Sequence, residues 1–326
     1  MDTAIFETLY GEGLITETEL SSVQQQPKLV NLHWELRTLL YLGILLLTSG
    51  LSILIYKNLD TIGHTVIIVF IALACAGCYM YCIKKSPGYS RQKIKSPNTW
   101  YDYIVLLGSL LLLALVAYVQ YQYNLFGNKL SIAAAIPMVL LFITAYYFDH
   151  LGILSLAITN LAAWAGITAT PLNMLQRNDF SNSSIIFTGL LIGALLAAAA
   201  LFSISKNIKQ HFAFTYTNFG SHLLFIAGIA AMIHFDSLYF LWAIVLAGFI
   251  YLSYTHAMRQ HSFYFLLITV LYGYITLSYV VIRLLTLISL EMAAVYLGFM
   301  YFIISGILLI RLLIRYNKIL KNNASL

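Results

Sequence analysis

The stretch that decides the fold is HWELRTLLYLGILLLTSGLSILIYKNLDTIGH, residues 33–64. Between Arg37 and Lys57 it runs for 19 residues without a charged side chain. At about 1.5 Å of rise per residue, a helix of that length crosses the ~30 Å hydrocarbon core of a bilayer. The basic residue at each end can reach a headgroup layer while its aliphatic stem stays in apolar surroundings. The stretch therefore predicts a transmembrane helix.

The composition of the whole chain points the same way. Of its 326 residues, 61% are hydrophobic and 9% are charged, against about 45–50% and 25% in soluble domains. A water-soluble fold of this composition could not cover its surface with polar groups. The first 30 residues lack the basic start and apolar run of a cleavable signal peptide, so we expect the spans themselves to hold the protein in the membrane.

Apolar runs of spanning length recur along the chain, bounded by charged residues, Pro, Asn or Gly. They predict an all-α bundle of about ten transmembrane helices in a domain of residues 34–326. The expected ranges are 38–57, 64–83, 100–120, 130–148, 150–170, 184–204, 219–235, 237–255, 262–282 and 292–314. Very tight turns join 130–148 to 150–170 and 219–235 to 237–255, so merging one pair would change the count.

The basic residues predict the orientation of these spans. With the N-terminus on the cytoplasmic side, all but four of the 18 Lys and Arg residues fall in cytoplasmic segments; the four are Lys57, Lys129, Arg177 and Arg283. The positive-inside rule expects this asymmetry. An even number of spans then places both termini in the cytoplasm. The basic loop 84–98 is the strongest anchor of this topology, and it also suggests contact with anionic membrane lipids. The net charge of +6 arises from these segments and gives no reason to expect nucleic acid.

Residues 1–33 differ in kind from the rest. The sequence IFETLY predicts a short helix, GEG breaks it, and Thr16 with Glu19 three residues later forms a capping-box pattern for a second helix. Five acidic residues precede the first lysine. A unit this short has too little core to fold alone. We expect a cytoplasmic acidic helical hairpin that caps the membrane domain or docks on a protein partner or a second copy.

The stretch quoted above follows the hairpin sequence GLITETEL, and together they resemble an uncharacterised family of bacterial integral membrane proteins, domain of unknown function 2157. Its members have a soluble N-terminal hairpin, a glycine-bearing first span with an exit like YKNLD, and many further spans. The resemblance is strongest over residues 1–85. It implies a multi-pass protein of the bacterial cytoplasmic membrane and supplies no catalytic residue.

Chemistry inside a membrane usually depends on ionisable groups, because they are costly to keep there. None of the ten runs has Asp, Glu, Lys or Arg near its middle. The softer candidates for a polar transport pathway are Asn160, Tyr272, Tyr279, Asp102 and Arg283. Structural roles in helix packing are the alternative for each of them. His222 and His234 are expected at the two membrane interfaces, where they bound the seventh run.

Small residues are better explained by assembly. Gly189, Gly193 and Ala197 follow the small-xxx-small pattern, as do Ala162 and Gly166, and such residues let helices approach closely. The three cysteines share one face of the second run and are expected to pack there. The chain shows no nucleotide-binding loop, no HExxH, no GxSxG and no catalytic pair of carboxylates. We therefore expect neither an enzyme nor a cofactor nor a metal site.

Two functions remain open from the sequence. One is a membrane-anchored scaffold or sensor that acts through its cytoplasmic hairpin. The other is a small-molecule transporter built from two inverted halves of five helices. A transporter should show a polar cavity at mid-depth on which Asn160, Tyr272 and Tyr279 converge, whereas a scaffold should show a filled bundle.

Overall fold

The computed structural model describes residues 16, 33–57, 63–98, 100–127, 129–169, 183–287 and 291–324. These described residues fold into helices and connecting loops, without a strand. The chain divides into two units, Met1–Gly63 and His64–Leu326, which are described separately. Almost all of the predicted hairpin, residues 1–33, lies outside the described residues.

In the first unit the described structure is helix α3 (His33–Lys57). Its hydroxyl side chains donate hydrogen bonds to carbonyls one turn earlier, from Thr48 to Ile44 at 2.9 Å and from Ser52 to Thr48 at 2.8 Å. These bonds satisfy polar groups within the helix itself, as a lipid environment requires. The apolar stretch Thr38–Leu54 belongs to this helix.

The second unit contains nine α-helices in its described part. Each is long and apolar enough to cross a membrane. In chain order they are α5 (His64–Lys85), α6 (Tyr101–Tyr123), α7 (Leu130–Phe148), α8 (Leu151–Ala169), α10 (Ser183–Ser205), α11 (Phe212–His234), α12 (Tyr239–Arg259), α13 (Phe263–Leu287) and α14 (Glu291–Ala324), with a short 3-10 helix η1 (Asp236–Leu238) before α12. The predicted polytopic helical bundle is thereby confirmed.

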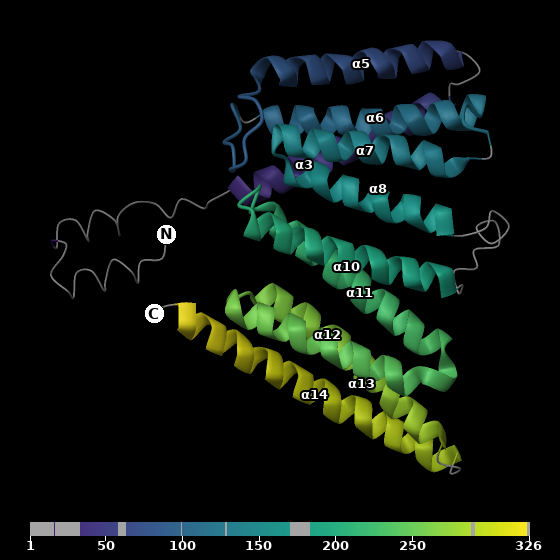
Figure 1. Cartoon of the computed structure of the whole chain (residues 1–326), viewed down its shortest axis with the longest axis vertical. Coiled ribbons are helices and arrows are strands. Elements are labelled where there is room, and N and C mark those ends of the chain that lie inside the picture. The colour runs from purple at the N-terminus through teal and green to yellow at the C-terminus, as the bar shows by residue number, and fades with distance from the viewer. Residues whose placement is uncertain are drawn as a thin grey trace. The chain divides into compact units, whose positions relative to one another are not determined.

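Within this unit helices that follow one another in the chain pack side by side. The closest pairs are α5 with α6, α7 with α8, α10 with α11, and α12 with α13. Figure 1 shows the series running from α5 at one edge to α14 at the other. This order places the loops after α5, α7, α10 and α12 at one end of the helices and the remaining loops at the other end.

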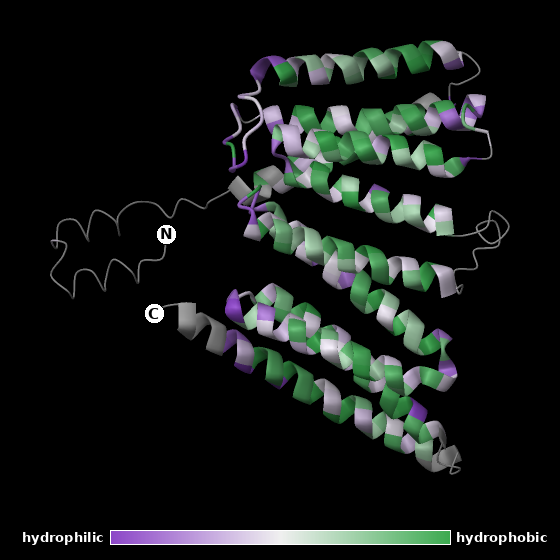
Figure 2. Ribbon diagram, in the orientation of Figure 1, coloured by the Kyte–Doolittle hydropathy of each residue, from purple (hydrophilic) through white to green (hydrophobic). Residues whose placement is uncertain are grey.

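The helices expose large apolar side chains along much of their length. Leu73, Leu201, Tyr251 and Phe299 are each at least two-thirds exposed. Hydrophilic residues gather at the helix ends and in the loops, as Figure 2 shows. A monomeric soluble protein rarely exposes so continuous an apolar surface to water, whereas the acyl chains of a bilayer solvate it.

Two helices extend furthest past their predicted bounds. Helix α14 continues to Ala324, ten residues past the expected end, and α11 begins at Phe212 instead of 219. The first turns of α11 contain the polar residues Thr215 and Asn218, which interrupt the apolar run that predicts a span. In the fold Thr215 is buried and Asn218 Oδ1 accepts a 2.8 Å hydrogen bond from Tyr264, so polar groups are accommodated on the helix.

The early start of α11 corrects the expected position of His222. This histidine lies well inside the helix, near its middle, and does not bound it. It is half-buried, and its Nδ1 lies 2.9 Å from the Tyr272 hydroxyl of α13. His234, the last residue of α11, does lie at a helix end.

Candidate functional site at one end of the helices

The residues predicted to line a transport pathway do not meet in one place. Asp102 lies in the first turn of α6, where it accepts a 2.6 Å hydrogen bond from Ser96. Arg283 lies near the end of α13, where it pairs with Asp236 and sits over the Tyr239 ring at 5.7 Å. The chain order puts these two ends of the helices on opposite sides of the unit.

The candidates expected near the middle of the spans also lie in two separate places. Tyr272 stacks on Phe225 with ring centroids 4.8 Å apart, and Tyr279 packs against the same apolar cluster, around Met232 and Leu246. Asn160 lies half-buried on α8, which packs against α7 and α10. The structure thus brings the two tyrosines together and places Asn160 among other helices.

The glycines of α10 mark a close approach to α11. A Cβ added at Gly193 would lie 2.8 Å from Leu224 Cγ, and one added at Gly189 would lie 3.1 Å from Ala227 Cβ. Ala197 belongs to the same contact, since its backbone nitrogen would lie 3.2 Å from a Cβ at Gly220. On α8 the second small-residue pair behaves differently: Ala162 is half-buried, and a Cβ added at Gly166 would meet nothing within 4 Å.

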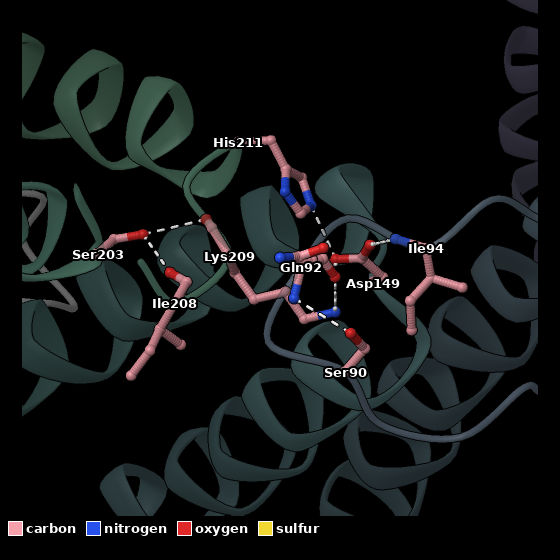
Figure 3. A network of polar contacts seen from close by, with 8 residues as sticks. All are labelled: Ser90, Gln92, Ile94, Asp149, Ser203, Ile208, Lys209 and His211. Atoms are coloured by element: carbon pink, nitrogen blue, oxygen red, sulfur yellow. Dashed lines mark hydrogen bonds and ion pairs between the residues drawn. The ribbon is translucent and has the colours of Figure 1, made fainter. Parts of the chain in front are cut away.

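A dense polar arrangement lies at the helix ends, in three loops that we call the cap: residues 86–98, 149–150 and 206–211. Its centre is Asp149, whose side chain is 2% exposed. Lys209 Nζ approaches Asp149 Oδ1 at 2.8 Å, and His211 Nε2 approaches the same oxygen at 2.7 Å. The backbone N–H of Ile94 donates to the other oxygen at 2.6 Å. One carboxylate therefore ties together all three loops (Figure 3).

Local backbone geometry places these side chains. Asp149 ends α7 in the left-handed conformation, with φ 59°, and its N–H bonds back to the Ala145 carbonyl. Asp tolerates this conformation, which breaks the helix in two residues and leaves the carboxylate at the helix end. Lys209 also has positive φ, 49°. A non-glycine residue persists there only when its surroundings hold it.

Lys209 is held on every side. Its side chain is fully buried. Its N–H donates to the Arg91 carbonyl at 2.7 Å, its carbonyl accepts from Ser203 at 3.0 Å, and its ammonium lies 5.6 Å from the Tyr89 ring centroid. A buried cation of this kind needs its counter-charge, because desolvation costs several kcal/mol per ion.

His211 acts as a neutral partner in this network. Burial lowers the pKa of His211, and the nearby Lys209 and Lys93 lower it further, while Asp149 opposes them. At neutral pH the ring therefore donates its Nε2–H to Asp149 without carrying a charge. The formal charges of Asp149 and Lys209 then balance each other.

A hollow of about 400 Å³ opens beside this cluster. Three of its lining residues come from the first cap loop and three from the third: Arg91, Gln92, Lys93, Asn207, Gln210 and His211. The hollow carries two cations and three amides, and no acidic residue lines it. We call it the basic hollow.

A larger hollow, of about 850 Å³, lies among α10, α11, α12 and α13. Its walls are mainly apolar, with residues such as Leu191, Leu201 and Phe249, and a few hydroxyls and His256. Asn160, Tyr272 and Tyr279 are not among its lining residues. It is therefore not the polar mid-depth cavity that the transporter hypothesis expects.

Within the described part of the chain, no group of three or more His, Cys, Asp or Glu could hold a metal ion. Two of the three cysteines of α5, Cys75 and Cys82, are buried in its packing. Cys75 lies 3.4 Å from the Gly108 carbonyl of α6.

Fold and site together define a multi-pass helical membrane protein with a polar cap across one end of its helices. Residues 7–154 match the family model DUF2157, described as a predicted membrane protein. This match confirms the family resemblance and extends it beyond residue 85, through α7 to the start of α8. The matched stretch includes Ile94 and Asp149 but not Lys209 or His211. No curated protein and no solved structure matches the chain.

Sequence reasoning missed the centre of the cap. Asp149 sits in the tight turn between two runs and Lys209 counts there as one more basic loop residue, so neither stands out alone. The available signal was topological: the charge pattern puts the loops at 84–98, 149–150 and 205–211 on one side of the membrane. An acidic residue among so many basic neighbours is a candidate ion-pair partner.

Proposed function

We propose that this protein is a membrane-anchored scaffold or sensor of the bacterial cytoplasmic membrane, acting at its cytoplasmic face without enzymatic activity. The observation that carries the proposal is the cap. Its three loops are fixed by one buried carboxylate, and it is the densest polar arrangement in the described part of the chain. A fixed polar surface at a helix end is suited to recognition.

The distribution of charge supports a role at the membrane surface. Helices α5 to α13 carry Asp, Glu, Lys and Arg only near their ends. A proton-coupled carrier ordinarily needs a carboxylate or a histidine at mid-depth, and His222, near the middle of α11, is the candidate for such a group. The positive-inside rule supports a cytoplasmic position for this end, because the cap loops are basic. An even count of ten spans then puts the acidic segment 1–33 and the C-terminus on the same side, where the segment can dock on a protein partner or a second copy.

The proposal is tested by photo-cross-linking in cells. A cross-linking amino acid replaces exposed Lys206 in the cap, and in a control chain it replaces exposed Leu125 at the opposite helix end. A scaffold gives a discrete protein adduct from position 206 and none from position 125. Deleting residues 1–26 should remove the adduct while membrane insertion persists. Equal adduct patterns from the two positions would contradict the proposal.

The alternative is a small-molecule transporter, and one observation favours it. The apolar hollow among α10 to α13 is large enough for a drug-sized apolar solute. Uptake profiling in vesicles with and without the protein, against a broad metabolite pool, separates the two functions. Protein-dependent accumulation of a solute, without an adduct at position 206, would establish transport.

A further inference from the structure

The basic hollow has a charge balance that favours an anion. Asp149, the acidic residue beside it, is buried and already neutralised by Lys209. Arg91 and Lys93 line the hollow with exposed side chains. The ion pairs recorded for the described part of the chain involve neither of them. No recorded ion pair with a described carboxylate therefore neutralises the two cations that line the hollow.

The amide groups around the hollow add hydrogen-bond donors. Gln210 donates through its side-chain nitrogen to Asn207 Oδ1. Asn207 and Gln92 also line the hollow, and the amide of each carries an NH₂ group that can donate hydrogen bonds. A guanidinium, an ammonium and amide N–H groups together form the donor set that binds phosphate oxygens.

The walls of the hollow are fixed before any ligand arrives. The Arg91 carbonyl accepts from the backbone of Lys209 at 2.7 Å, and Ile94 bonds to Asp149. Ser90 Oγ accepts from the N–H of Gln92 at 3.1 Å. The bond to Arg91 joins the first cap loop to the third, the bond to Asp149 joins it to the second, and the bond to Ser90 lies within the first loop. Preorganised walls reduce the entropy lost on binding.

We propose that the basic hollow binds a phosphate group, supplied by the headgroup of an anionic phospholipid or by free phosphate. Its volume of about 400 Å³ accommodates either. Its position at the helix ends, beside the basic residues that flank the bilayer, is where lipid headgroups lie. The inference deepens the proposed function, since it names the class of ligand that a sensor at this face would read.

The test uses the full chain purified in detergent and two probes. Native mass spectrometry measures the binding of phosphatidylglycerol against phosphatidylcholine with the same acyl chains. A thermal-unfolding series compares sodium phosphate with sodium chloride at equal ionic strength. The first probe reports on a lipid headgroup and the second on free phosphate.

Two double variants provide the matched comparison. R91Q/K93Q removes two charges from the hollow, while K84Q/K85Q removes two exposed charges from the last turn of α5, outside it. We expect R91Q/K93Q to lower the affinity for whichever probe binds by about thirty-fold. This figure follows from about 1 kcal/mol of binding free energy for each of the two cations. K84Q/K85Q should leave it nearly unchanged. Thermal midpoints in chloride check that both variants fold.

Each outcome decides the proposal. Selective binding of phosphatidylglycerol, or stabilisation by phosphate, that is weakened strongly in R91Q/K93Q and not in K84Q/K85Q would support it and identify the source of the phosphate. Equal losses in both variants would show diffuse attraction and overturn it, as would the absence of a response to both probes. The assay contains no protein partner, so its result is independent of the cross-linking test of the scaffold.

Discussion

Replacing Asp149 with Ala is the sharpest test of the cap. The substitution leaves Lys209, which is fully buried, without its counter-charge, and it removes the acceptors used by Ile94 and His211. Breaking a buried ion pair on one side costs about 3–5 kcal/mol. We expect a loss of unfolding free energy of that size, seen as a lower thermal midpoint in detergent.

A local readout distinguishes an opened cap from a general loss of stability. The first cap loop contains the tryptic sites Arg91, Lys93 and Lys95. In the D149A chain this loop loses its bond to the carboxylate, so trypsin should cleave it faster at temperatures well below the unfolding midpoint. The measurement is the cleavage rate by mass spectrometry.

The control is an ion pair that is exposed instead of buried. Asp236 pairs with Arg283 at the other helix end, and its side chain is 63% exposed. Exposed pairs contribute about 0–1 kcal/mol, so D236A should barely change the midpoint. The double variant D149A/K209M leaves neither charge buried and should cost clearly less than the sum of its two single variants. Equal costs for D149A and D236A, or strict additivity in the cycle, would refute the reasoning.

Three further predictions concern pH, packing and topology. Because burial lowers the pKa of His211, this ring binds fewer protons in the folded state than in the unfolded state. Its contribution to stability is therefore fully present above about pH 6.5 and falls as the pH drops below that value. H211Q should flatten this slope in midpoints measured between pH 7.5 and 6, and an unchanged slope would contradict the assignment. A Cβ at Gly193 would lie 2.8 Å from the Leu224 side chain and 3.1 Å from its backbone nitrogen, so G193A should lower the free energy of unfolding by about 1–3 kcal/mol. G166A, with open space around it, should be neutral or stabilising. Similar losses in both variants would argue against close packing of α10 on α11. Reporter tags fused to the two chain ends should lie on the same face of the membrane, and tags on opposite faces would overturn the even span count.

The helical spans follow from the sequence because lipid imposes a simple local requirement. A backbone in hydrocarbon must satisfy its own hydrogen bonds, and an apolar run of sufficient length can do so as a helix. The run 130–148 matches α7 at both ends, and 184–204 differs from α10 by one residue at each end. The predicted start of α11 is too late because polar Thr215 and Asn218 interrupt the apolar run, although the fold buries Thr215 and bonds Asn218 to Tyr264.

The candidate site depends on contacts that no local pattern encodes. Asp149 lies 55 positions from Ile94 and 62 from His211 along the chain. These groups meet because antiparallel helices return their loops to one end and because the backbones of Asp149 and Lys209 turn left-handed there. By itself, the sequence determined a multi-pass helical protein with basic loops on one side. The tertiary structure decided that Asp149, Lys209 and His211 meet in a buried network, since the free energy of a buried charge depends on which partners surround it.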